Sequence, residues 1–320
     1  MTYQFTEIDS DLSSLPKLSG WVTSGRAETF ESVAFRSGAA LTVLDQLINY
    51  PKPRVPVKLL ANRLALNAAT ATSKLEGRLA READIRDAYH LTPYGEVRGP
   101  DGDLLAYWRE AARLRLTGPD WHVALKALVG PEFEMDVDGW LQSVANQSQT
   151  SGPLAVCVAV MRAVLQADDR AERVACLLSD IVLARFLNWP RILPVSALNL
   201  TKAMLRDLVR DGQQAKMVVQ QRLLQSIEET IRLARDLAQR GAALQAIAPK
   251  LRAKGSEAAV AVFLSEDAVA PSTMLSPTIQ GTTIPMTDRA ARRFCDRLVE
   301  LGVAREWTGR STFWLYGIVR

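Results

Sequence analysis

The chain has 320 residues, of which 48% are hydrophobic and 23% are charged, and its formal net charge is +4. This composition is too apolar for a disordered protein, and the length is sufficient for about two domains. Residues 1–12 are polar and acidic, whereas a secretory signal begins with basic and then apolar residues. The longest apolar run, residues 154–161, is far shorter than the ~18 to 20 residues that cross a bilayer. We therefore expect a cytoplasmic protein without membrane contact.

The cysteines and histidines do not form a recognisable catalytic or metal site. Cys157, Cys176 and Cys295 are far apart and include no C-x-x-C pair, so we expect buried thiols in a reducing compartment. His90 and His122 have no nearby nucleophile or ligand cluster in the sequence, which favours structural or surface roles. Neither common glycine-rich phosphate motif is present. The sequence therefore predicts no metal, no cofactor and no enzymatic activity.

Helical periodicity dominates the first part of the chain. Apolar residues at spacings of three and four predict helices over about residues 33–48, 56–75 and 104–116. Pro56 suits the first turn of the second helix, because a missing N–H does no harm there. Asp103 is the expected N-cap of the third helix. These helices follow a polar N-terminal lead.

A bundle is the expected arrangement of the helices that follow. Residues 156–165 and 174–187 are apolar on most sides, which is typical of central helices. Ser196 is expected to cap a further helix that ends near Gly212. The longest predicted helix covers residues 215–240, and its apolar stripe either packs inside the bundle or forms a dimer seam. We favour packing inside the bundle, because the spacing is not a sustained heptad and the stripe ends in alanines. The stripe consists of Val219, Leu223, Ile227, Ile231, Ala234 and Ala238.

Beyond Gly255 the sequence predicts three further helices. Ser256 can cap a short helix, and Ser276-Pro277 can open a second, weaker one. The third helix is the strongest, with Thr287 as its N-cap and Gly302 as its end. Its expected buried face contains Ala291, Phe294, Cys295, Leu298 and Leu301.

After Gly302 the apolar period changes from about 3.6 to 2, which predicts a β-hairpin. Residues 303–307 and 313–316 are its expected strands, and Thr308-Gly309-Arg310 is its turn. Three helices followed by a hairpin is the order of a winged helix, whose third helix lies in the DNA major groove. The predicted fold is mainly α, a multi-helix bundle with a C-terminal winged helix. The predicted parts are a polar lead (1–30), a helical domain (31–253) and a winged-helix-like domain (256–320).

Positive charge is concentrated on the third helix of this predicted module. Residues 281–320 contain seven basic and four acidic residues, whereas the other 280 residues contain 32 basic and 31 acidic residues. Cations on the reading helix are what phosphate neutralisation requires, so DNA is the predicted partner. Such arginines are also common on solvated helix faces, and winged helices also bind proteins. The candidate nucleic-acid-binding residues are Arg289, Arg292, Arg293 and Arg297 on the helix and Arg310 at the hairpin tip.

The segment from Thr72 to Gly77 (TSKLEG) resembles the inhibitory helix motif [ST]-x-x-x-E-[GN] of Fic proteins. In that family the glutamate, here Glu76, pairs with an arginine of the active-site motif and blocks productive nucleotide binding. The active motif H-x-F-x-[DE]-G-N-G-R is absent from this sequence. AMP transfer is therefore not expected, and Glu76 is interpreted as a surface or capping residue.

Residues 68–90 and 287–318 resemble an uncharacterised alpha-proteobacterial family, often plasmid-borne, known only as a domain of unknown function. The similarity covers residues ~30 to 320, though its motifs are loose. The tail is similar to the helix-turn-helix tail of a related group with degenerate Fic-like helical domains. This resemblance implies a helical domain with a DNA-binding-type tail and transfers no catalytic residue.

Two functions are consistent with the sequence. The first is a DNA-binding or regulatory protein whose helical domain senses a signal, forms a homodimer or binds a protein partner. The second is a non-catalytic protein-interaction module with a degenerate Fic-like helical domain. Phosphate contacts weaken as salt concentration rises, whereas apolar protein contacts do not, so the salt response distinguishes the two functions.

Overall fold

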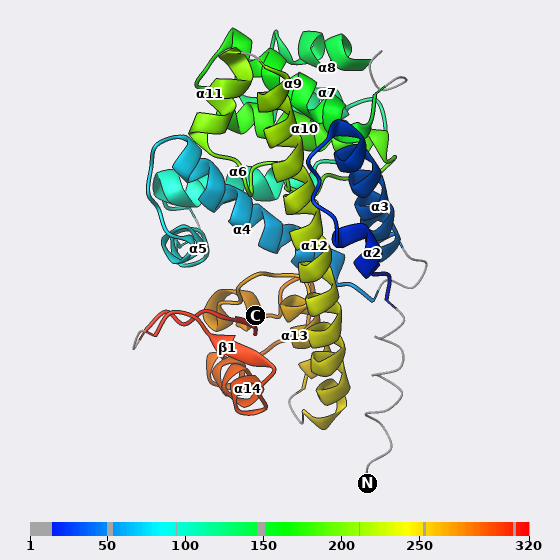
Figure 1. The fold of residues 1–320 in the computed structure, drawn as a ribbon. Coiled ribbons are helices and arrows are strands. Elements are labelled where there is room, and N and C mark those ends of the chain that lie inside the picture. The colour runs from blue at the N-terminus through cyan, green and yellow to red at the C-terminus, as the bar shows by residue number, and fades with distance from the viewer. Residues whose placement is uncertain are drawn as a thin grey trace.

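Helices make up most of the protein, and one two-stranded sheet lies near the C-terminus (Figure 1). This confirms the predicted mainly α-helical fold. Within the described residues, no helix is both long enough and apolar enough to cross a membrane. The computed structural model describes residues 15–49, 54–93, 95–145, 151–210, 212–251, 254–309 and 312–319.

We divide the described residues into a helical body (15–251) and a C-terminal module (254–319). The helices of the body are α2 (Gly20–Thr23), α3 (Phe30–Ile48), α4 (Val57–Leu75), α5 (Glu82–His90), α6 (Gly99–Arg113), α7 (Trp121–Val129), α8 (Val137–Ala145), α9 (Pro153–Ala167), α10 (Glu172–Phe186), α11 (Lys202–Arg210), α12 (Gln213–Ile247) and η2 (Ala248–Lys250). The module contains α13 (Ser256–Phe263), η3 (Pro271–Leu275), α14 (Asp288–Glu300), β1 (Ala304–Glu306) and β2 (Tyr316–Ile318).

Helices α9 and α10 pack along each other in the interior of the body. The residues from Val174 to Ala184 on α10 are all buried, as expected for a helix that is apolar on most sides. Cys157 on α9 and Cys176 on α10 are buried free thiols, and so is Cys295 in the module. The sequence therefore identified these central helices correctly.

Helix α12 is the longest element, with 35 residues and a length of about 52 Å. It runs from the α9–α10 end of the body down to the module (Figure 1). It packs along α3 and also contacts α4, α9 and α11. All six residues of the apolar stripe predicted from the sequence are buried within the single chain. Contacts inside the bundle thus already cover the stripe that was considered as a dimer seam.

Three of the predicted helix caps are wrong. Ser256 is the first residue of α13, whose N-cap is Gly255. Asp103 lies inside α6, which begins four residues earlier at Gly99 because Pro100 occupies the first turn. Ser196 does not begin a helix, because its hydroxyl and its N–H both donate to Asp180, and α11 starts only at Lys202. Short helices α5, α7 and α8 were not predicted, and each contains only nine residues. At Ser196 a tertiary contact therefore decides the local structure.

In the module, the predicted helix after Ser276-Pro277 is absent. A five-residue π-helical turn, η3, precedes this point and is closed by a hydrogen bond from Ser276 N–H to Pro271 O at 3.0 Å. Ser276 is extended, and Thr278 forms an antiparallel bridge with Pro285. The chain therefore reaches α14 through a short, bridged loop.

Strand β2 begins at Tyr316, not at Phe313 as predicted, and it pairs on both of its edges. β1 and β2 are antiparallel, with Ala304 opposite Ile318. On the other edge of β2, Tyr316 exchanges backbone hydrogen bonds with Val269, which lies between α13 and η3. Phe294 on α14 faces Phe263 on α13, with 6.3 Å between the ring centroids. One hydrophobic core extends without interruption from the body into the module.

Asp180 on α10 is a buried acid. Its Oδ1 accepts hydrogen bonds from the Ser196 hydroxyl at 2.7 Å, from Ser196 N–H at 2.9 Å and from Val195 N–H at 3.2 Å. Its Oδ2 is buried and has no hydrogen-bond partner among the described residues. Burial, which these hydrogen bonds offset only in part, raises the pKa of Asp180 to about 7.

The substitution Asp180→Asn should change how stability depends on pH. A carboxyl with a raised folded-state pKa stabilises the fold below its unfolded pKa of about 4 and loses this contribution as the pH rises through about 7. Between about pH 5 and pH 8 the variant should gain on the order of a few kcal/mol relative to the wild type in urea unfolding. Asp207→Asn, an exposed acid on α11, controls for the lost charge. A stability difference that stays constant with pH would contradict this account.

Candidate functional site

Helix α14 is the element on which the sequence placed most of the candidate residues. The Thr287 hydroxyl accepts a hydrogen bond from Ala290 N–H at 3.3 Å and caps the helix as predicted. Ala291, Phe294, Cys295 and Leu298 are buried on one face as predicted, which fixes the opposite face toward solvent. Leu301, also predicted for the buried face, is exposed because it lies beyond the last residue of α14. In Figure 1, α14 lies at the end of the molecule opposite α8 and α11.

The cations of α14 are concentrated in its N-terminal half. Arg289 and Arg293 are one turn apart, are exposed, and form no ion pair with any described residue. Arg292 is also exposed, and its guanidinium carbon lies 3.7 Å from the ring centroid of Trp314 in the hairpin. This contact holds one arginine against the wing and leaves the other two toward solvent.

The C-terminal half of α14 contains two acids, Asp296 and Glu300, which offset the positive charge of this half. Arg297 forms an exposed ion pair with Glu300, in which the N–O distance is 2.8 Å. Asp296 accepts a hydrogen bond from the Tyr316 hydroxyl at 2.9 Å, which ties α14 to β2. The structure thus brings Arg289, Arg292 and Arg293 together as one cationic surface. Arg297 lies one turn after Arg293 and is paired with Glu300.

The loop between the two strands is stabilised by a single carboxylate. The Glu306 side chain accepts hydrogen bonds from Thr308 N–H at 2.7 Å and from Gly309 N–H at 2.9 Å. Gly309 has a φ of 61°, a conformation that favours glycine. Phe313, on the other side of the loop, is 66% exposed. Arg310, the predicted hairpin-tip contact, lies outside the described residues.

A buried ion cluster joins the module to the body. Arg109 on α6 donates hydrogen bonds to Glu266 and to Asp267, the two acids that follow α13. His90 at the end of α5 contacts Asp267 at 3.3 Å through its Nε2. Burial alone would raise the pKa of Asp267, but His90 and Arg109 beside it hold that pKa well below its usual range. The cluster is thus a charged contact in the interior.

Arg63 on α4 extends this junction to the hairpin. Its Nη2 donates to the Ile318 carbonyl at 2.8 Å, and its guanidinium lies over the Trp307 ring at 5.7 Å. Arg86 on α5 approaches the same ring at 5.8 Å. The base of the hairpin therefore faces the body, whereas α14 faces away from it.

None of these junction residues was predicted as functional from the sequence. One signal was present, because Glu266 and Asp267 interrupt an otherwise apolar stretch from Ala258 to Ala270. Two adjacent acids in such a stretch require a buried cation. Their partner Arg109 is more than 150 residues away in the chain, so no local pattern identifies it.

The segment from Thr72 to Gly77 is the C-terminal end of α4. Gly77 has a φ of 80° and donates to Lys74 O, while Arg78 N–H donates to Ser73 O, which together form a Schellman motif. The Thr72 hydroxyl donates to Ala68 O at 2.8 Å and accepts from Trp108 Nε1 at 3.0 Å, so it is committed to packing.

Glu76 is the C-cap residue of α4 and pairs with two arginines. Its Oε1 accepts from Arg173 Nε at 2.6 Å, and its Oε2 accepts from Arg78 at 3.1 Å. The Arg173 guanidinium also lies over the Tyr107 ring at 5.1 Å. These contacts give the segment a structural explanation as a helix end that is tied to α10.

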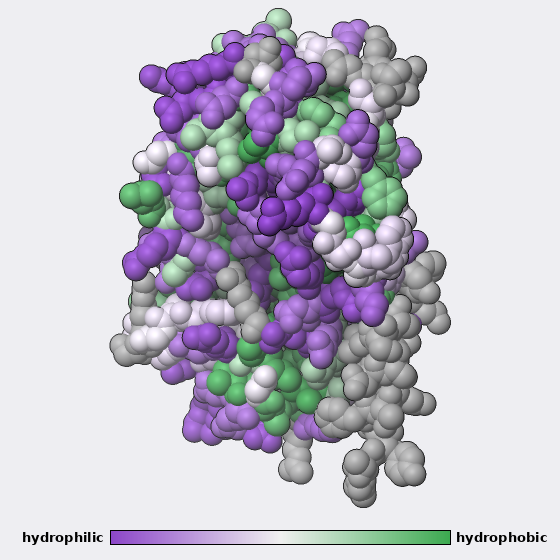
Figure 2. Space-filling view, viewed as in Figure 1, coloured by the Kyte–Doolittle hydropathy of each residue, from purple (hydrophilic) through white to green (hydrophobic). Residues whose placement is uncertain are grey.

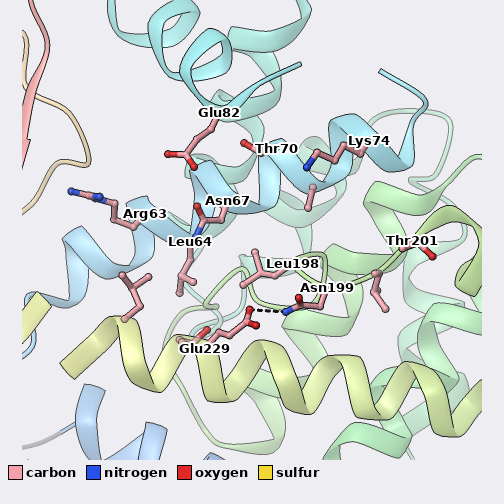
Figure 3. A pocket seen from close by; sticks show the side chains of 14 residues that line it. Arg63, Leu64, Asn67, Thr70, Lys74, Glu82, Leu198, Asn199, Thr201 and Glu229 are labelled. Atoms are coloured by element: carbon pink, nitrogen blue, oxygen red, sulfur yellow. Dashed lines mark hydrogen bonds between the residues drawn. The ribbon is translucent and has the colours of Figure 1, made fainter. Parts of the chain in front are cut away.

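A polar pocket of about 630 Å³ lies between α4, α12 and the connection before α11 (Figure 3). Asn199 Nδ2 donates to Glu229 at 2.8 Å across its lower side. Arg63 lies at one end, and its guanidinium points away from Asn199. Arg63 and Lys74 balance Glu82 and Glu229 in the pocket wall, so the lining favours neither anions nor cations.

Residues 6–318 match the protein family described as "Protein of unknown function (DUF1403)". Because the match covers nearly the whole chain, the protein belongs to this family, and the expected membership in a family of unknown function is confirmed. A comparison with curated proteins found no match. These findings do not connect the chain with Fic proteins or with a particular group of bacteria.

The substitution Arg109→Met should destabilise the protein strongly. It leaves Glu266 and Asp267 buried without their cation, which typically costs about 3 to 5 kcal/mol. Arg113→Met on the same helix is the matched control, because Arg113 is exposed and should change stability by less than about 0.5 kcal/mol. Urea unfolding of the three proteins measures both effects. Equal stability of the two variants would show that the cluster does not hold the module in place.

Proposed function

We propose that the C-terminal module is a winged helix that binds double-stranded DNA through α14 and the hairpin. The cationic surface of Arg289, Arg292 and Arg293 is the observation that carries the proposal. The helical body would then hold the module and present α14 outward.

The order of elements supports a winged helix. α13, the extended residue Val269, η3, α14, β1 and β2 follow one another, and β2 lies between β1 and Val269. This is the order of the helices and strands in a winged helix, with its second helix reduced to the short turn η3. In such a module the third helix is the one that enters the major groove.

The distribution of charge supports DNA as the partner. The major groove admits an α-helix, and residues in the N-terminal part of a reading helix contact base edges. Arg289 and Arg293 lie in that part of α14 and are unpaired among the described residues. One acid of the helix, Asp288, lies beside them, and the other two, Asp296 and Glu300, lie in the other half. Arg292, held against Trp314, is placed to contact a phosphate.

A second candidate function is docking on a protein. The exposed Phe313 in the hairpin favours it, because large exposed aromatic side chains are enriched at protein interfaces. Val299 and Leu301 at the end of α14 are also more than one-third exposed. In this alternative the contact is apolar and survives an increase in ionic strength that weakens phosphate contacts.

Combined substitution Arg289→Ala and Arg293→Ala should weaken binding to a labelled duplex of mixed sequence. Each lost phosphate contact lowers the slope of log K against log salt by about 0.9, so the slope should fall by about 2. Fluorescence anisotropy at several salt concentrations measures the affinity and the slope together.

The matched control is Arg170→Ala with Arg206→Ala, two exposed cations in the body that should leave binding unchanged. An equal loss of duplex affinity in the two double variants would show that the net charge of the protein, and not α14, determines binding. Absence of duplex binding by the wild type at low salt would reject the DNA proposal and favour docking on a protein.

A further inference from the structure

A second and larger recess lies between the helical body and the C-terminal module. It has a volume of about 1460 Å³ and opens to solvent. Its walls are the start of α4, the ends of α3, α6 and α12, helix α13, the connection after α10 and the loop 280–282. We call this recess the junction groove. It is separate from α14, none of whose residues lines it.

The charged residues of the junction groove are strongly unbalanced. Four cations line it, namely Arg54, Lys58, Arg113 and Arg191, against one acid, Glu266. Glu266 is 8% exposed and is already paired with the buried Arg109, so it does not offset these cations. In a chain whose net charge is only +4, this local excess is marked.

Three of the cations are available for a ligand. Lys58, Arg113 and Arg191 are exposed and form no ion pair or hydrogen bond through their side chains with any described residue. Cations gathered around a recess repel one another and lower the local potential energy of an anion. The groove is therefore electrostatically complementary to an anionic ligand with several charges.

The size and the remaining lining indicate the kind of anion. Pockets for small molecules typically measure about 300 to 1000 Å³, so the junction groove is suited to a longer ligand. Pro56 and Leu264 provide apolar surface in the groove, and Gln245 and Gln280 are exposed on its walls. Cations along a groove suit the phosphate backbone of a single strand, and amide groups beside them suit the edges of its unpaired bases.

We propose that the junction groove binds a single strand of nucleic acid, with Lys58, Arg113 and Arg191 contacting its phosphates. The apolar wall then covers the faces of the bases, and Gln245 and Gln280 reach base edges. This site does not depend on α14, because the duplex and the single strand would occupy different surfaces.

The test uses the full chain with Arg289→Ala and Arg293→Ala as background, so that α14 does not contribute. A labelled single-stranded oligonucleotide of mixed sequence is titrated at several salt concentrations. Adding Lys58→Ala, Arg113→Ala and Arg191→Ala should weaken binding at least tenfold. The salt slope should fall by about 2, since each single-strand phosphate contact contributes about 0.7.

The matched control adds Lys17→Ala, Arg170→Ala and Arg206→Ala, three exposed cations that do not line the groove. It should leave single-strand binding unchanged. Equal weakening by both triple sets would overturn the proposal, and so would single-strand binding that resists the groove substitutions.

A third experiment uses ATP as competitor, in order to distinguish a site for a nucleic-acid strand from a site for a free nucleotide. We expect an unlabelled oligonucleotide to displace the labelled strand far more effectively than ATP does. Binding of ATP alone, without binding of the strand, would also overturn the proposal. Circular dichroism of each variant verifies that it is folded. The single-strand measurement does not depend on the duplex proposal, because every protein in it already carries the two α14 substitutions.

Discussion

The buried pairing of Arg109 with Glu266 and Asp267 determines how the two parts of the protein are joined. Two adjacent carboxylates in the interior require a cation, and α6 provides it in one orientation. His90 completes the contact from α5. Because the acids directly follow α13, this pairing positions the whole C-terminal module. The continuous hydrophobic core then provides the nonspecific part of the stability.

This junction decides which surfaces of the module remain free. The contacts of Arg63 with Ile318 and Trp307 bury the base of the hairpin against the body, whereas Phe313 is exposed. Helix α14 lies on the far side, where its cations meet solvent. On the surface of Figure 2, hydrophilic side chains predominate, and an apolar area lies at the level of α13 and the lower part of α12. The attachment of the C-terminal module to the helical body thus positions both the proposed duplex site and the proposed single-strand site.

Elements that are determined by a local sequence pattern were predicted from the sequence. The predictions failed where residues distant in the chain determine the local structure. Thr287 and the change of period after Gly302 correctly indicated the start of α14 and a pair of antiparallel strands. The predicted second strand, 313–316, was placed too early, because β2 is Tyr316–Ile318. Ser196 is a residue type that often caps helices, yet its hydroxyl donates a hydrogen bond to the buried Asp180. The TSKLEG pattern is likewise explained by a Schellman helix end. Grouping Arg289 with Arg293 follows from helical spacing, whereas the junction groove joins segments from six parts of the chain and has no sequence pattern.

Hydrogen exchange of the full-length protein with and without a duplex tests the central claim most directly, because it locates the contact without any substitution. If α14 binds DNA, amides of α14 and of the hairpin loop should exchange more slowly in the complex, and those of α7 and α8 should not change. Binding of the duplex without protection of α14 would contradict the account. Protection confined to the helical body would place the contact elsewhere.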